Sequence, residues 1–170
     1  MKIDQKEFHP YYTTYIEKAS ETSILEGLRK NLDANVAFYK SIPKDKEAYR
    51  YEEGKWTIKD ILLHIIDAER VFAYRCLRIG RGDTTPLSGF DQNIFVESAN
   101  ANSRSMSSLI EEYVAVRQST IRLFESFTDA DLLRMGVASD SDASVRAVGY
   151  IIIGHENHHC EVIKDRYLAV

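Results

Sequence analysis

The chain has 170 residues, of which 44% are hydrophobic and 28% are charged, and its net charge is −4 at pH 7. This length suits one domain over residues 1–170, with a single core that we expect to be a bundle over about residues 20–168. The acidic balance argues against a nucleic-acid partner, and no apolar run approaches the roughly 18 residues that a membrane span needs.

The N-terminal residues Met1–Glu7 are polar and lack the apolar segment of a secretory signal. Cys76 and Cys160 lie far apart in the sequence and resemble no disulfide framework. We therefore expect a cytoplasmic protein whose thiols are reduced.

The first part of the chain predicts one short and one long helix. Aromatic side chains before residue 20 favour a short helix that packs as a lid. From Thr22 to Pro43, apolar residues recur at steps of three and four, which is the pattern of an amphipathic helix. Proline cannot continue this helix, so we expect it to end at Pro43. The aromatic face of the short helix comprises Tyr11, Tyr12, Tyr15 and Ile16.

A second long helix is predicted from about Ile58 to Ile79. Thr57 is a suitable N-cap, and Asp60 favours the positive end of the helix dipole. Gly80 is expected to stop the helix. His64 lies near one margin of the apolar stripe, about 60° from its centre at about 100° per residue.

Residues 80–104 are rich in Gly, Ser, Asn and Asp, and we expect a long excursion with one helical turn at Gln92–Ser98. Excursions of this length in compact domains are usually functional. A third long helix is predicted after either Ser105 or Ser108, because both are suitable caps. Its apolar residues have heptad-like spacing, and Arg117 lies on the same stripe.

Three further segments complete the chain. Residues 128–133 predict a short turn, residues 136–142 a polar loop, and residues 143–167 a fourth long helix. Four long amphipathic segments without an alternating strand pattern predict an all-α four-helix bundle. Because residues 80–104 are long enough to cross the bundle, a simple up-down-up-down order does not follow.

Histidines on two predicted helices suggest a metal site. His155 and His159 lie one turn apart on an apolar face, and buried imidazoles need partners. A divalent metal ion would satisfy both rings, and His64 would supply a third ligand. Three protein ligands with one open position are typical of catalytic rather than structural sites. The alternative is that one histidine is a hydrogen-bonded core residue and the others lie on the surface.

His158 offers a second register for the metal pair, since it lies three residues after His155. On the helical wheel it is about 60° from the apolar centre, whereas His155 and His159 straddle that centre. We therefore expect His158 to lie around the metal ligands or on the surface.

Arg117 has two alternative roles, because a charge on an inward stripe must be paired or hydrated. In the structural role its guanidinium pairs with a carboxylate such as Asp67 or Glu69, or its head reaches solvent. In the functional role it lines the metal cavity and binds a carboxylate of the substrate or of a thiol cofactor.

Over most of residues 20–168, the chain resembles the DinB/YfiT-like superfamily of metal-binding four-helix proteins. The combination of a Trp-Thr-Ile segment, one histidine in the second helix and a late His-x-x-x-His carries the resemblance. The residues are Gly54-Lys-Trp-Thr-Ile-Lys-Asp-Ile-Leu-Leu-His64, then Ile-Ile-Asp67-Ala-Glu69-Arg70, and Gly154-His-Glu-Asn-His-His159.

The resemblance implies an up-down-down-up bundle with a long crossover between the second and third helices, and often a homodimer. It also implies a divalent transition metal, such as nickel or zinc, held by His64, His155 and His159. His158 and Asp67 would surround these ligands. Relatives often continue the last motif with Arg-Gly-Gln, whereas this chain has Cys-Glu-Val after His159, so any substrate role of that segment does not transfer.

The leading functional hypothesis is a metal-dependent enzyme that activates a low-molecular-weight thiol or water for transfer to a small electrophilic substrate. Thiol-dependent transferases and isomerases occur among the proteins that the chain resembles. The alternatives are a small metal-dependent hydrolase and a non-catalytic stress protein that binds metal or a small ligand. A helical bundle with structural histidines is the plainest alternative.

Overall fold

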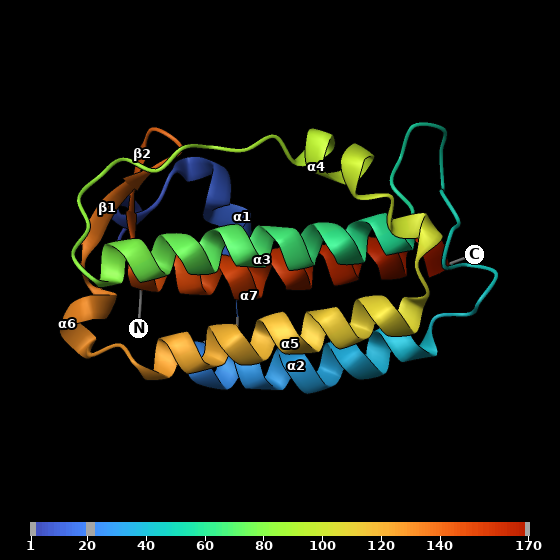
Figure 1. Ribbon diagram of the computed structural model, residues 1–170, viewed down its shortest axis with the longest axis horizontal. Coiled ribbons are helices and arrows are strands. Elements are labelled where there is room, and N and C mark those ends of the chain that lie inside the picture. The colour runs from blue at the N-terminus through green and yellow to red at the C-terminus, as the bar shows by residue number, and fades with distance from the viewer. Residues whose placement is uncertain (1–2, 20–22, 169–170) are drawn as a thin grey trace.

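The computed structural model describes residues 3–19 and 23–168. Four long helices form a bundle in which α3 contacts α5 and α7, and α2 contacts the same two helices (Figure 1). The mostly helical architecture predicted from the sequence is therefore confirmed. The four helices are α2 (Ile24–Ser41), α3 (Ile58–Gly80), α5 (Met106–Glu125) and α7 (Val145–Val162).

Short elements flank these four helices and connect them. None of the helices in the described residues is long and apolar enough to cross a membrane. The short helical elements are η1 (Gln5–Glu7), η2 (Pro10–Tyr12), α1 (Thr13–Lys18), α4 (Gln92–Ala99), η3 (Ala101–Ser103), α6 (Asp129–Leu132) and the π-helical turn η4 (Ile163–Leu168).

Side-chain caps set the first residue of each long helix. Ser23, Thr57, Ser105 and Ser144 each accept a hydrogen bond from the backbone N–H three residues later. Such a cap contributes about 1 kcal/mol to stability. The hydrogen bonds confirm Thr57 as the N-cap of α3 and select Ser105 rather than Ser108 as the N-cap of α5.

The polar loop predicted for residues 136–142 is wrong, and so is the absence of strands. β1 (Met135–Ala138) and β2 (Ser141–Ser144) form an antiparallel hairpin in which Ala138 lies opposite Ser141. Its turn residues, Ser139 and Asp140, have φ angles of 53° and 59°. Two-residue turns of this kind usually contain Asn-Gly or Asp-Gly, so Ser-Asp gives little sequence signal. The fourth helix consequently begins at residue 145.

The excursion after α3 runs along the outside of the bundle to the start of α5, and α4 packs against α3 on the way (Figure 1). The helical turn predicted at residues 92–98 is confirmed as α4. Leu87 pairs through its backbone with Val137 and Ser139, so the hairpin holds the first part of the excursion. This placement brings Phe90 and Asn93 to the side of α3.

The short aromatic helix predicted near the N-terminus is confirmed as η2 and α1, and α1 packs on α7. Gly154 allows this contact, because a Cβ atom there would lie only 1.6 Å from the carbonyl oxygen of Tyr15. Asn157 Nδ2 also donates to the carbonyl oxygen of Lys18 at 2.9 Å. The N-terminal tyrosines are thereby fixed beside α3 and α7.

Candidate metal site

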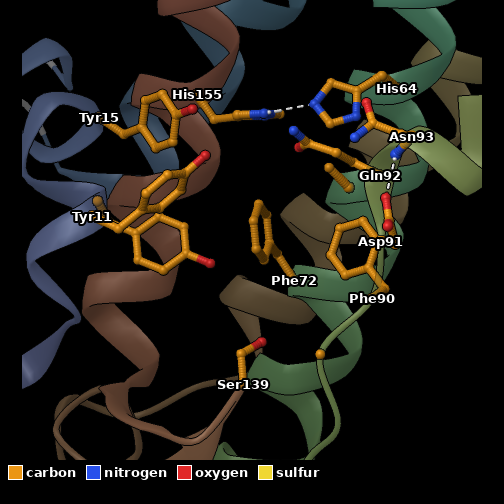
Figure 2. A pocket seen from close by; sticks show the side chains of 13 residues that line it. Tyr11, Tyr15, His64, Phe72, Phe90, Asp91, Gln92, Asn93, Ser139 and His155 are labelled. Atoms are coloured by element: carbon orange, nitrogen blue, oxygen red, sulfur yellow. Dashed lines mark hydrogen bonds between the residues drawn. The ribbon is translucent and has the colours of Figure 1, made fainter.

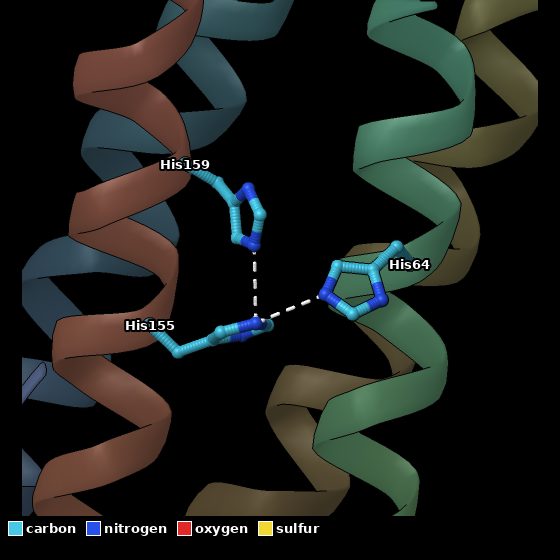
Figure 3. Close-up of side chains that lie close together, drawn as sticks. All are labelled: His64, His155 and His159. Atoms are coloured by element: carbon cyan, nitrogen blue, oxygen red, sulfur yellow. Dashed lines mark hydrogen bonds between the residues drawn. The ribbon is translucent and has the colours of Figure 1, made fainter. Parts of the chain in front are cut away.

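His64 on α3 and the pair His155 and His159 on α7 point toward one another (Figure 3). The Nε2 atom of His155 lies 3.0 Å from that of His64 and 3.1 Å from that of His159. His64 and His155 are buried, and His159 is partly buried. The convergence predicted from helical periodicity is therefore present in the structure.

The hydrogen-bonding capacity of the three rings fits a cation. A neutral imidazole carries one N–H donor and one lone pair, so a single hydrogen on His155 Nε2 satisfies only one of its two contacts. A divalent ion accepts a lone pair from all three rings. Ligands of a tetrahedral zinc ion at 2.0–2.1 Å lie about 3.3 Å apart. The distances of 3.0 and 3.1 Å from His155 Nε2 are close to this value, and all three ligand atoms lie within 4.8 Å of one another.

Burial keeps the three imidazoles in the neutral form that binds metal. Desolvation lowers the pKa of His64 to about 4 and that of His159 to about 3. It also lowers the pKa of His155 well below its ordinary value, and the neighbouring histidines add to this effect. At neutral pH no proton therefore competes for the ligand nitrogens.

A cavity of about 630 Å³ opens beside His64 and His155 (Figure 2). Aromatic side chains from the N-terminal segment, α3 and the excursion form its walls, and polar side chains near the start of α4 lie beside His64. Its lining comprises Tyr11, Tyr12, Tyr15, His64, Ala68, Phe72, Gly89, Phe90, Asp91, Gln92, Asn93, Ser139 and His155.

A second cavity of about 310 Å³ approaches the cluster from the side of His159. It is lined in part by His158, Trp56 and Asn93, and Asn93 also lines the larger cavity. The Trp56 ring lies 4.8 Å from the ring of His64. The histidine cluster is thus reached from two directions, which suits a catalytic site better than a closed structural one.

Comparison with known proteins identifies the family of this chain. The family model of the DinB superfamily matches residues 27–163. The chain belongs to the DinB superfamily. No curated protein matches its sequence significantly.

A solved structure of another protein resembles this member of the DinB superfamily. It is YfiT from Bacillus subtilis, described as a probable metal-dependent hydrolase with an unusual four-helix bundle topology. The TM-score is 0.72 at 15% sequence identity, over 97% of this chain and 90% of that one. At this identity the likeness shows a shared fold.

His158 and Asp67 of this DinB-superfamily chain lie outside the histidine cluster. The His158 ring packs against Tyr15 and His159, with ring centroids 5.4 and 5.3 Å away. Asp67 accepts a hydrogen bond from Arg70 at 3.1 Å. Burial raises the pKa of the Asp67 carboxyl above its ordinary value, although Arg70 opposes this effect.

Arg117 is fully buried and pairs with two glutamates. Its Nε and Nη2 atoms donate to Glu69 at 2.8 and 2.9 Å, while Nη1 and Nη2 each donate to Glu156 at 3.0 Å. Arg117 lines neither cavity beside the histidines. The geometry therefore favours the structural role over substrate binding, with Glu69 as one expected partner.

Sequence reasoning missed several residues in this DinB-superfamily site and around it. Glu156 was overlooked, although a charge next to His155 in an apolar run is a detectable signal. Arg75 was also overlooked, although it lies eleven residues after His64, which places both on one helix face. Phe90 and Asn93 could not be found in this way, because their approach to the cavity depends on how the excursion packs against α3.

Proposed function

We propose that His64, His155 and His159 hold a divalent transition metal ion, and that the protein is a metal-dependent enzyme acting on a small molecule. The observation that carries this proposal is the convergence of two buried imidazoles and one partly buried imidazole beside two open cavities. When bound, such an ion acts as a Lewis acid and lowers the pKa of a water molecule or thiol.

The residues of the chain have separate tasks in this proposal. The three imidazoles stay neutral and converge, so the ion needs no protein carboxylate. Aromatic rings of the larger cavity bind the apolar part of the substrate and exclude water. The Asn93 side chain lies at both cavities and is placed to hydrogen-bond a polar substrate group near His64.

The nucleophile is either water or a low-molecular-weight thiol, and the electrophile is a small substrate in the larger cavity. The description of YfiT as a probable metal-dependent hydrolase supports the water-based reaction. The second cavity beside His159 supports a second small reactant, such as a thiol. Nickel and zinc are the proposed ions, because neutral imidazole suits both.

Two experiments test the metal site. Protein purified without a nickel column is analysed for metals, and zinc affinity is then measured for the wild type, His155→Ala and His158→Ala. We expect His155→Ala to weaken zinc binding more than about 100-fold, since a ligand is lost, and His158→Ala to weaken it less than about tenfold. Equal losses would contradict the proposed ligand pair.

An activity screen then distinguishes the two nucleophiles. The metal-loaded protein is incubated with small electrophilic esters, amides and halides, with and without a thiol such as cysteine. Turnover without thiol that is lost in His64→Ala supports hydrolysis, whereas turnover that requires thiol supports transfer. Tight zinc binding without turnover of any of these substrates would favour the non-catalytic metal-binding alternative.

Other properties that the resemblance implies also remain proposals. The path of the excursion along the bundle supports the up-down-down-up order of α2, α3, α5 and α7 (Figure 1). A single domain, a homodimer and a cytoplasmic location rest on the sequence and the family. Light scattering at micromolar concentration tests the homodimer, and a monomer there would contradict it.

A further inference from the structure

Arg75 is a second buried arginine. It does not itself line the larger cavity, but it contacts three residues of the lining, Ser139, Phe72 and Phe90. Only 4% of its surface is exposed. Its Nη2 atom donates to the carbonyl oxygen of Ser88 at 3.1 Å and to Ser139 Oγ at 2.8 Å. Its Cζ atom lies 5.7 and 5.9 Å from the ring centroids of Phe72 and Phe90, which both line the cavity.

No carboxylate neutralises this guanidinium. Within residues 3–19 and 23–168, Arg75 forms no ion pair, and its Nε atom is buried without a hydrogen-bond partner. Asp142 lines the same small cavity of about 20 Å³ as Arg75 but does not pair with it. A buried cation with only neutral acceptors is unfavourable, and an anion bound nearby would remove much of that cost.

Ser139 connects Arg75 to the larger cavity. Its hydroxyl oxygen accepts the Arg75 hydrogen bond, so its hydrogen points away from the guanidinium and is available to a ligand. The backbone N–H of Ser139 donates to the carbonyl oxygen of Leu87 at 2.9 Å, which fixes the turn. In Figure 2, Ser139 lies at the end of the cavity opposite His64 and His155.

The larger cavity also has one acidic residue in its lining, away from Ser139 (Figure 2). Asp91 is the acidic side chain of the lining, and its Oδ1 atom accepts hydrogen bonds from the backbone N–H groups of Asn93 and Ile94 at 2.8 and 3.4 Å. It therefore caps α4 beside Asn93 (Figure 2). An anionic ligand group would avoid Asp91 and favour the Ser139 end, where the unpaired guanidinium lies.

We infer that the cavity selects small molecules that carry a carboxylate, which binds at Ser139 beside Arg75. The apolar middle of the molecule, best an aromatic ring, packs between Phe72, Phe90 and the N-terminal tyrosines. Its reacting group then lies beside His64 and His155. This inference rests on the proposed function for the position of the reacting group. The carboxylate subsite at Ser139 and Arg75 does not depend on the metal site.

The test uses probes with a metal-binding hydroxamate at one end and a variable group at the other. These are 4-carboxybenzohydroxamate, its neutral partner 4-carbamoylbenzohydroxamate, and homologues of each with one or two added methylenes. Calorimetry on the zinc-loaded protein gives the affinity ratio of carboxylate to carboxamide. We expect a ratio of at least about tenfold for the best spacer, since hydrogen bonds to charged groups are strong.

Arg75→Met should reduce this ratio to within about twofold, because the variant keeps the length of the side chain and removes the charge. Arg78→Met is the matched control: it lies one turn further along α3 and pairs with Asp83 outside the cavity. It should leave the ratio unchanged. A ratio near one in the wild type, or a ratio that survives in Arg75→Met, would overturn the inference.

A measurement on the wild type decides the question if Arg75→Met fails to fold. The side-chain Nε–H signal of Arg75 is followed by NMR during titration with each probe. It should move with the carboxylate probe and stay in place with the carboxamide, and a signal unmoved by both would overturn the inference. Repeating the titrations without metal separates the two proposals. A failure to bind zinc refutes the metal site, whereas the affinity ratio measured without metal tests the carboxylate subsite by itself.

Discussion

The two buried arginines of this protein have similar burial and opposite surroundings. Arg117 is 0% exposed and contacts two glutamates, whereas Arg75 is 4% exposed and contacts a carbonyl oxygen, a hydroxyl and two aromatic rings. Burial alone thus says little about the role of a charged residue. A buried arginine with a countercharge belongs to a closed structural network, whereas one without a countercharge can bind an anionic ligand.

In the Arg117 network, two glutamates already balance the charge of the arginine. Burial disfavours the charge, but the carboxylates of Glu156 and Glu69 raise the pKa of Arg117 well above its ordinary value. Glu156 also accepts hydrogen bonds from Tyr113 Oη and from Asn31 Nδ2, the latter at 2.9 Å. Because Glu156 follows His155 on α7, this network fixes the backbone that carries the histidine pair.

The largest expected effect comes from Arg117→Met. The variant leaves two buried glutamates without their cation, so we expect a loss of about 3–5 kcal/mol in the free energy of unfolding. Urea denaturation followed by circular dichroism measures this loss. If the variant still folds, its preference for the carboxylate probe over the carboxamide probe should match the wild type, because Arg117 lines neither cavity.

A charge-balanced variant provides the control for Arg117→Met. Adding Glu69→Gln and Glu156→Gln removes the unpaired charges and should recover a large part of the lost stability. A loss below about 1 kcal/mol for Arg117→Met alone would contradict the structural role. So would a selective loss of probe affinity at unchanged stability.

The pair between Arg146 and Glu7 is an intermediate case, because its side chains are 17% and 11% exposed. Hydrogen bonds from Arg146 lower the pKa of Glu7 to about 2, although burial opposes this shift. Since the folded pKa is below the unfolded value, the stabilisation is present above about pH 4.5 and is lost as the pH falls toward 2.

We expect this pair to contribute about 1–2 kcal/mol, after allowance for solvent screening of a partly exposed group. Urea midpoints of the wild type and Glu7→Gln are compared at pH 6 and pH 3. The difference between the two proteins should shrink at pH 3, because the Glu7 carboxyl is then largely protonated in the unfolded chain while the folded protein keeps it mostly ionised. A difference that grows on acidification would show that another group dominates.

Arg75→Met should have the smallest effect on stability, below about 1 kcal/mol in the ligand-free protein. No carboxylate is left unpaired, and methionine fits the aromatic surroundings. The acceptors Ser88 and Ser139 are exposed, so water can replace the lost hydrogen bonds. Thermal unfolding of Arg75→Met and Arg117→Met measures the contrast directly. Similar losses of stability in the two variants would contradict the different roles of the two arginines.

Helical periodicity explains how much of this architecture could be predicted. The four long helices, the cap at Thr57, and the position of His64, His155 and His159 on the apolar sides of their helices all follow from local spacing. Each depends on residues within one or two turns, where sequence and structure are directly linked.

The features that sequence reasoning missed depend on contacts between distant segments. The hairpin turn at Ser139 lacks glycine, and only its pairing with Leu87 and its contact with Arg75 reveal its position. Phe90 and Asn93 reach the cavity because the excursion packs against α3, which no local pattern specifies. The pairing of Glu156 could not be predicted locally, because its partner Arg117 lies on another helix.

The close contact at Gly154 has a consequence for how the protein is made. The hydrogen bond from Asn157 to Lys18 joins residues 139 positions apart, so α1 must wait for α7 before it has a surface to pack on. Ribosomes add about 5–20 residues per second, so several seconds separate the synthesis of these two helices. A nascent chain that ends before α7 carries His64 without its two partners and cannot complete the aromatic wall. Incomplete chains should therefore neither sequester metal in the cell nor bind substrate prematurely.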